Sequence, residues 1–334
     1  MIAFLGPNPA IDRTALVETL RLNGILRPVE VLVLPGGKAL CAARAARALG
    51  AEVAVGLIVG GHAGRWLVAA SEGEGLRPVA VECDTETRST YVVVDEHGRS
   101  LAVYEPSGPV SAATFDAFLA MVGAELAPRA DWCVLAGSLP RGIDPGAYGA
   151  LVERCHGAGR PCLVDTGGES LRAAVSARPE VVKVSRDEAE SAGFGGHGSG
   201  LWRAGEAARA LVAMGARFAV VTDGSRGCAA SDGHDLWFVE PPRIQARSPI
   251  GSGDAFAAGL VTAWAAGRSV EDALVQATAA GAANALCLGA GRLDPTAMAS
   301  LLPRVRIRQR RICRSFGVSV TTPRRPQGGH DAAP

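Results

Sequence analysis

The sequence predicts an α/β fold in which a largely parallel sheet packs against helices and a small second β-sheet forms a lid. From residue 111 to residue 184, apolar strands alternate with helices, which favours parallel strands joined by crossover helices. Glycine-rich turns open directly into helices at residues 36–38 and 251–254. Two stretches, 13–34 and 78–104, replace the alternation with consecutive strand patterns, and we expect them to form the lid.

The composition excludes several classes of function. The chain has 334 residues, 48% of them hydrophobic, so it can bury a large core. Its 34 basic and 33 acidic residues leave a net charge of +1, which indicates neither a nucleic-acid nor a membrane partner. The first residues lack the basic segment of a signal peptide, and no apolar run is long enough to span a bilayer. We therefore expect a cytoplasmic protein.

The cysteines are also typical of a cytoplasmic protein. None of the eight is part of a C-x-x-C pair, and most fall in apolar strands or helices. This pattern predicts buried, reduced thiols and not a disulfide framework or a zinc site.

The stretch 247–260 combines a flexible turn with an apolar helix. The residues that disfavour regular structure in the turn are Ser248, Pro249, Gly251 and Gly253. A turn that opens into a buried helix directs free N–H groups and the positive end of the helix dipole at one point, where an anion binds. Asp254 could simply cap the helix. A carboxylate beside an anion site can also accept the proton of a hydroxyl that attacks a phosphoryl group, and this predicts a small-molecule kinase.

The residues Gly251-Ser252-Gly253-Asp254 resemble the G-A-G-D signature of the ribokinase-like, PfkB-type carbohydrate kinases. The resemblance implies a three-layer α/β/α sandwich with a small β-sheet lid. It also implies that Asp254 is the catalytic base and that Gly251, Ser252 and Gly253 form the anion hole. Pro249 stands where the family usually has Thr.

Three further stretches resemble the sugar-binding motifs of this family. Residues 8–12 resemble N-P-A-x-D, residues 36–38 begin a motif similar to G-G-K-G-x-N-x-A, and residues 137–140 match G-S-L-P. In the second motif, Cys41 replaces an Asn that bonds the substrate. Arg88 resembles the Arg of E-T-R, which holds the phosphate of sugar-phosphate substrates, although a solvated strand arginine gives the same pattern. The implied substrate residues are Asp12, Gly36, Gly37, Lys38, Cys41, Arg88, Ser138 and Arg27.

The nucleotide side is indicated by two more resemblances. Residues 183–188 resemble K-P-N-x-x-E, with Ser185 in place of the Asn, and the family role of Glu188 is to hold Mg²⁺ through water. Residues 222–227 resemble the nucleotide-binding turn, and Asn284 is either an adenine contact or a helix-packing residue. The resemblance implies ATP and Mg²⁺ as cofactors. No G-x-x-x-x-G-K-[ST] motif is present, which excludes a P-loop kinase. The implied nucleotide residues are Lys183, Ser185, Glu188, Thr222, Gly224, Gly227 and Asn284.

The sequence divides into a core, a lid and a tail. We assign residues 1–12, 35–77 and 105–303 to the core, and residues 13–34 and 78–104 to the lid. The arginine-rich residues 304–334 show little apolar periodicity, and we expect them to be disordered. Lid-to-lid homodimers are common in the family, so a homodimer is implied as well.

The resemblance is closest to the branch that contains 1-phosphofructokinase, tagatose-6-phosphate kinase and the minor 6-phosphofructokinase. It implies phosphorylation of fructose 1-phosphate, fructose 6-phosphate or tagatose 6-phosphate to the bisphosphate. One alternative is a kinase for an unphosphorylated sugar or nucleoside. Another is a non-catalytic sugar-phosphate sensor, because Cys41, Ser185 and Pro249 depart from the family pattern.

Overall fold

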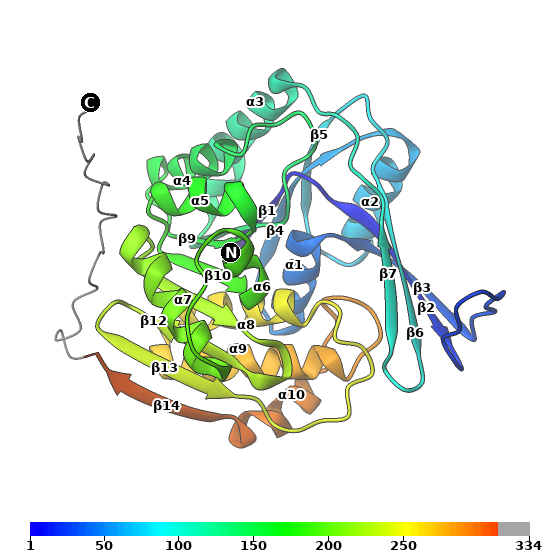
Figure 1. Ribbon diagram of the computed structural model, residues 1–334. Helices are drawn as coiled ribbons and strands as arrows, with labels where there is room; N and C mark the ends of the chain where they lie inside the picture. The colour runs from blue at the N-terminus through cyan, green and yellow to red at the C-terminus, as the bar shows by residue number, and fades with distance from the viewer. Residues whose placement is uncertain (313–334) are drawn as a thin grey trace, which may run out of the picture.

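The computed structural model describes residues 1–312, which form two β-sheets and two layers of helices. The strands of the large sheet are β1 (Ile2–Gly6), β4 (Val53–Val59), β5 (Pro78–Glu82), β8 (Trp132–Ala136), β9 (Cys162–Asp165), β10 (Val181–Ser185), β11 (Phe218–Thr222), β12 (Cys228–Ser231), β13 (Asp235–Glu240) and β14 (Arg306–Arg311). Their order in space is β14-β13-β12-β11-β10-β9-β8-β1-β4-β5 (Figure 1). The strands from β5 to β11 in this order are parallel, and β12, β13 and β14 are antiparallel.

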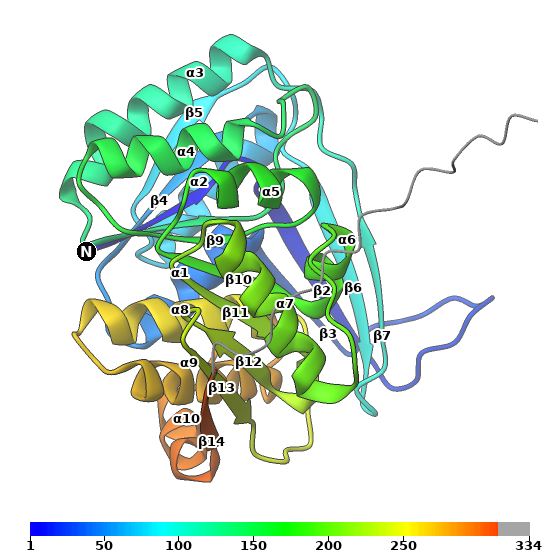
Figure 2. The same ribbon diagram turned by 60° about the vertical axis from the view of Figure 1, so that its left-hand side comes forward.

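Helices cover both faces of this sheet, which confirms the predicted three-layer sandwich (Figure 2). One layer consists of α1 (Lys38–Ala48), α2 (Gly61–Gly73), α8 (Ser252–Ala265), α9 (Val270–Ala285) and α10 (Pro295–Leu301). The other consists of α3 (Ala112–Met121), α4 (Ala147–Gly157), α5 (Gly168–Ser176), α6 (Arg186–Ser191) and α7 (Gly200–Met214). Short helical turns complete the set: η1 (Val122–Leu126), η2 (Ala127–Arg129), η3 (Gly224–Arg226) and η4 (Leu302–Arg304).

The central strands are apolar along their whole length because both of their faces are covered. All residues of β1 and β4 are buried. Phe4 packs with one helix layer, whereas its neighbours Ala3 and Leu5 pack with the other, as the two-residue period of a strand requires. The carboxyl ends of these parallel strands lie at one edge of the sheet, which is where ligands bind in such folds.

The second sheet is the predicted lid. Its strands are β2 (Ala10–Val17), β3 (Glu30–Gly36), β6 (Ser89–Asp95) and β7 (Ser100–Tyr104), in the order β3-β2-β6-β7. In Figure 1 it stands beside the large sheet. Asp12 is opposite Thr90, and Thr90 is opposite Tyr104, so these three side chains share one face of the lid.

One strand was assigned to the wrong sheet. The first strand of the predicted lid stretch 78–104 is β5, and it pairs in parallel with β4 at the edge of the large sheet. Val79 and Val81 pack against the core beneath α3, which anchors β5 there. An alternating strand pattern shows that one face is buried, but it does not identify the sheet that buries it.

The tail prediction is wrong for its first part. Residues 306–311 form β14, which pairs with β13 although almost every residue is charged or polar. Main-chain pairing needs no apolar side chain, and Ile307 adds a contact with the core. Arg310 lies 5.2 Å from the ring centre of Trp202. The remainder of the predicted tail, residues 313–334, lies outside the described residues. Within residues 1–312, no helix combines the length and apolar character needed to cross a membrane.

Candidate active site

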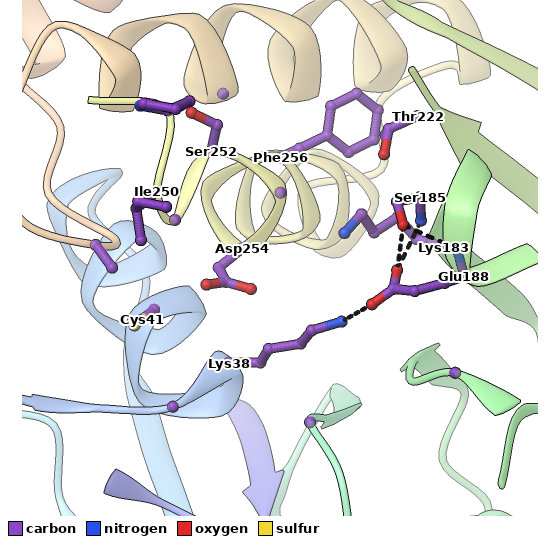
Figure 3. A pocket seen from close by; sticks show the side chains of 18 of the residues that line it. Lys38, Cys41, Lys183, Ser185, Glu188, Thr222, Ile250, Ser252, Asp254 and Phe256 are labelled. Carbon is purple, nitrogen blue, oxygen red and sulfur yellow. Dashed lines mark hydrogen bonds and ion pairs between the residues drawn. The ribbon is translucent and has the colours of Figure 1, made fainter. Parts of the chain in front are cut away.

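A cavity of about 1500 Å³ lies between the carboxyl edge of the large sheet, the lid and the start of α8. Most of the residues singled out from the sequence line it. These are Asp12, Gly37, Lys38, Cys41, Arg88, Ser138, Lys183, Ser185, Glu188, Thr222, Gly224, Gly227, Gly251, Ser252, Gly253 and Asp254. The fold therefore brings residues from seven separate stretches of the chain to a single site, and Figure 3 shows part of it.

The turn before α8 has the backbone geometry of an anion site. Gly251 has φ 85°, and a Cβ atom there would lie 2.5 Å from Ala290 Cα, so only glycine fits. Among the described residues, nothing accepts a hydrogen bond from the N–H groups of Gly251 and Gly253. The Ser252 N–H instead donates to the Pro249 carbonyl at 3.2 Å. The anion hole thus has fewer free N–H donors than the sequence suggested, because the turn itself uses one.

Asp254 follows this turn and faces the cavity (Figure 3). Burial, together with the nearby Asp165 carboxylate, raises the pKa of Asp254 from 3.8 to about 7, although Lys38 and Lys183 act in the opposite direction. A carboxylate with this pKa can both accept a proton and release it near neutral pH. This is the property that a general base requires.

Two lysines and two carboxylates form a network beside Asp254. Lys38 Nζ lies 2.7 Å from Asp165 Oδ1 and 2.7 Å from Glu188 Oε1. Lys183 Nζ lies 2.6 Å from Asp165 Oδ2. Burial alone would raise the pKa of Asp165, but the two ammonium groups hold it below its usual value. Asp165 was not singled out from the sequence, although an Asp that ends the apolar strand β9 at the ligand-binding edge was a usable signal.

Lys38 lines the cavity and is paired with two carboxylates. The resemblance places it among the substrate residues, and its ammonium lies 2.7 Å from both Asp165 Oδ1 and Glu188 Oε1. Burial lowers the pKa of Lys38, yet the facing carboxylates outweigh burial and raise it, so the side chain stays charged. Lys38 therefore belongs with the carboxylates of the sheet edge.

Ser185 and Glu188 fix each other at the start of α6. The Ser185 hydroxyl accepts a hydrogen bond from the Glu188 N–H at 3.2 Å. Glu188 Oε2 accepts bonds from the Ser185 N–H and hydroxyl, both at 2.8 Å. This is a capping box, and it explains how Ser185 can replace the Asn of the family motif and still hold Glu188 in position.

The opposite end of the cavity lies beneath the lid. The Asp12 carboxylate accepts a bond from the Thr90 hydroxyl at 2.5 Å, and the Cys41 thiol lies 3.5 Å from it in donor geometry. A Cβ atom on Gly36 would lie 2.0 Å from Asp12 Cγ, so glycine at this position makes room for the carboxylate. Burial and the Asp12 carboxylate raise the pKa of the Cys41 thiol, which therefore stays protonated.

Arg88 is incompletely paired at this end. Its Nη1 donates to the Glu105 carbonyl at 3.3 Å, but its buried Nε has no acceptor among the described residues. Burial lowers the pKa of Arg88. Asn8 also lines the cavity. It begins the N-P-A-x-D motif, two residues after the end of β1, but was not placed among the implied substrate residues. Its Nδ2 donates to the Ser138 hydroxyl at 2.8 Å and fixes that hydroxyl.

The far end of the cavity is bounded by the turn after β11. Thr222 Oγ1 donates to the Val184 carbonyl at 3.3 Å, and a Cβ atom on Gly227 would lie 1.9 Å from the Val239 carbonyl oxygen. The cavity continues past small and apolar residues that the sequence reading did not single out. These are Pro241, Pro242, Ile244, Phe256, Thr278, Gly281, Ala282 and Ala285.

Three predicted contacts do not line the cavity: Gly36, Asn284 and Arg27. Asn284 is fully buried and donates to the Gly289 carbonyl, while its carbonyl oxygen accepts the Gly291 N–H at 3.3 Å. It therefore supports the turn that packs on Gly251, which is the helix-packing role considered as its alternative. Arg27 is exposed in the connection between β2 and β3 and does not line the cavity.

Known proteins share both this sequence pattern and this fold. The model of the family described as pfkB family carbohydrate kinase matches residues 5–297. A 1-phosphofructokinase of Rhodobacter capsulatus is 30% identical over 279 residues, which cover 83% of this chain and 88% of that protein.

Solved structures give the same result. The tetrameric inhibited form of phosphofructokinase-2 from Escherichia coli superimposes with a TM-score of 0.81 and 26% identity, covering 91% of this chain and 98% of that one. A possible 1-phosphofructokinase of Thermotoga maritima has a TM-score of 0.79 at 20% identity, covers 94% of this chain and 100% of that one, and supports the fold alone. The chain therefore belongs to the pfkB family of carbohydrate kinases, and it is an ATP-dependent enzyme of that family.

Proposed function

We propose that the enzyme transfers the γ-phosphoryl group of ATP to a hydroxyl of a ketohexose phosphate, giving the bisphosphate and ADP. The observation that carries this proposal is the half-satisfied guanidinium of Arg88 in the cavity beneath the lid. A buried donor without an acceptor is costly, and a phosphate group on the substrate would remove that cost. The candidate substrates are fructose 1-phosphate, fructose 6-phosphate and tagatose 6-phosphate, and the 1-phosphofructokinase of R. capsulatus supports this class.

The site residues have separate roles in this proposal. Asp12 would accept hydrogen bonds from sugar hydroxyls at the lid end, beside the Ser138 hydroxyl that Asn8 fixes. Asp254 would accept the proton of the attacking hydroxyl as its oxygen bonds to the γ-phosphorus and the bond to the ADP oxygen breaks. The N–H groups of Gly251 and Gly253 would stabilise the charge on the transferred group.

The lysine and carboxylate network would act on the nucleotide phosphates. Lys183 has a side chain that is only 4% exposed, and Asp165 holds its ammonium in place. A fixed cation stabilises phosphate charge without reorganisation during the reaction. The Lys183 side chain ends next to Gly253, since a Cβ atom on that glycine would lie 3.0 Å from Lys183 Nζ.

The donor set also fits Mg²⁺ held through water. Glu188 is 30% exposed, and both of its oxygens already accept bonds from Lys38 or Ser185. Such a carboxylate fits a hydrated ion better than direct coordination, and Mg²⁺ keeps most of its water shell. When bound, the ion would neutralise charge on the ATP phosphates, and Glu188 would orient its water.

The outer face of the lid supports a homodimer. Alternate residues of the lid strands point away from the cavity, and several are apolar and at least 41% exposed: Val31, Tyr91, Leu101 and Val103. A second copy of the chain would cover them, since a contiguous exposed apolar face marks an interaction site. Sedimentation of the intact enzyme over a range of concentrations tests this, and a monomer at all concentrations contradicts it.

The decisive experiment for the proposed reaction measures ADP release with Mg-ATP. The substrates are the three ketohexose phosphates, with fructose and ribose as neutral comparisons. We expect turnover of at least one phosphate and a much lower kcat/KM for fructose and ribose. Turnover of only the neutral sugars would replace the proposal with a sugar kinase. Tight binding of a sugar phosphate without any turnover would indicate a sensor.

A further inference from the structure

We propose that the enzyme binds a transition-metal ion such as Zn²⁺ at a second site, ligated by the Cys162 thiolate, His156 Nε2 and the Glu180 carboxylate. These groups come from the end of α4, the first residue of β9 and the residue before β10. They lie at the amino ends of the strands, whereas the kinase cavity lies at the carboxyl ends. Cys162 and the catalytic-site Asp165 are the two ends of β9, which places them about 10 Å apart.

The donor atoms already have nearly the spacing that an ion needs. His156 Nε2 lies 3.1 Å from Glu180 Oε2 and 3.9 Å from Cys162 Sγ, and all three donors lie within 4.8 Å of one another. A tetrahedral zinc ion with its usual bond lengths of about 2.0–2.3 Å holds its ligand atoms about 3.3–3.6 Å apart. Small side-chain adjustments would therefore suffice.

Burial and charge also fit a cation at this position. Cys162 is fully buried, whereas the side chains of His156 and Glu180 are 34% and 24% exposed. An ion could therefore enter from solvent and keep a water molecule as its fourth ligand. Within residues 1–312, no lysine or arginine forms an ion pair with Glu180, so its charge is free to balance a cation.

The surroundings of the three ligands favour a soft metal over Mg²⁺. The Cys162 N–H donates to Glu180 Oε2 at 2.9 Å, which orients the carboxylate from behind. Two more buried free thiols, Cys133 and Cys155, lie beside Cys162. Thiolate and imidazole ligands select zinc and its neighbours, whereas Mg²⁺ takes oxygen ligands. Binding would exchange the Cys162 thiol proton, released to water, for the ion.

Cobalt is the probe that separates this site from the kinase cavity. Titration of the full chain with Co²⁺, without nucleotide, should give the near-ultraviolet thiolate-to-cobalt band and the visible bands of tetrahedral cobalt, at one ion per chain. Carboxylates of the kinase cavity cannot give the thiolate band. Added Zn²⁺ should remove both sets of bands by displacement.

Two variants test the ligands, and two others serve as controls. Cys162→Ser should abolish the thiolate band, and His156→Gln should weaken cobalt binding by at least about tenfold. The matched controls Cys228→Ser, a buried thiol on β12, and Cys41→Ser, the thiol in the kinase cavity, should keep the band. Absence of the band in the wild type, or its survival in Cys162→Ser, would overturn the proposal.

A second readout does not depend on spectra or on kinase turnover. Saturating Zn²⁺ should raise the melting temperature of the wild type and of Cys41→Ser, because an ion that binds only the folded chain stabilises it. The rise should be clearly smaller in His156→Gln, which keeps every residue of the kinase cavity. An equal rise in His156→Gln would also overturn the site. Failure of the proposed sugar-phosphate reaction would leave both readouts unchanged.

Discussion

The two ends of the kinase cavity differ in how many of their polar side-chain groups already have an ion-pair or hydrogen-bond partner within the protein. At the sheet edge, Lys38, Lys183, Asp165 and Glu188 pair with one another at 2.6–2.7 Å. Beneath the lid, Arg88 retains a buried donor without an acceptor among the described residues. The paired end is built before any ligand arrives, as a reaction that depends on fixed charges requires. The unpaired end needs its ligand to complete it, so substrate selection belongs there.

The largest effect should follow from removing the base between these ends. We expect Asp254→Asn to lower kcat by about 10²- to 10⁴-fold, while the KM for ATP changes little, because the amide cannot accept the proton. In the wild type, kcat/KM should rise with pH until about pH 7, the pKa of Asp254. Steady-state kinetics over pH measure both. Asp187→Asn, an exposed neighbour of the cavity with a side chain 85% exposed, is the matched control and should keep its activity.

The next effect should come from breaking the paired end. Asp165→Asn would leave the buried ammonium of Lys183 without its carboxylate, and we expect it to lower the free energy of unfolding by about 3 kcal/mol. Urea unfolding measures the change. Asp131→Asn, which breaks the exposed ion pair with the amino terminus, should cost far less. Similar losses in the two variants would show that the inner network is not set up as described.

A smaller effect should follow at the unpaired end. We expect Arg88→Ala to raise the KM for the sugar phosphate by about 10- to 100-fold, the range expected for lost bonds to a charged group. Turnover of fructose, where measurable, should be unchanged, because that sugar lacks the phosphate. Arg88→Lys should recover only part of the loss, since an ammonium lacks the planar fork of Arg. An equal loss of activity with both substrates would show that Arg88 does not recognise the substrate phosphate.

The smallest effect concerns stability. Because the pKa of Asp254 is about 7 in the folded chain and 3.8 as its ordinary value, stability should fall as pH rises between these values and stay level above them. We expect Asp254→Asn to escape this cost and to be more stable than the wild type near pH 8, with no gain near pH 4. Urea unfolding at both pH values is the measurement. A gain of the same size at both would contradict the raised pKa.

The sequence predicted site residues that lie in glycine turns or directly after strands. It did not predict site residues that depend on contacts between distant parts of the chain. The turn at Gly251 and the Asp that follows it are visible as a pattern because backbone conformation restricts the residue types there. Asp165 carries no such local mark. Its role depends on two lysines that are 127 and 18 residues away in the chain.

The mistakes have a common physical cause. Strand patterns predicted β5 and the lid strands equally well. The alternation of side chains does not show which strand each of them pairs with, because that partner can lie far away in the sequence. Asn284 lies on a helix close to the cavity, and only its packing on the turn at Gly289 shows that its amide is already used. The metal site proposed above at Cys162 could not have been predicted from the sequence, because His156 and Glu180 follow no zinc-motif spacing.

The last described strand also determines where the chain can safely be shortened. β14 covers the edge of β13, whose main-chain groups would otherwise be open to pairing with another molecule. Its own outer edge carries exposed arginines, Arg306, Arg308 and Arg310 among them, and repulsion between like charges discourages the addition of a further strand. A chain cut at residue 303, the boundary that sequence composition suggests, would replace this charged edge with the apolar β13 and favour aggregation. The exposed arginines of β14 therefore help to keep the protein soluble at this edge of the sheet.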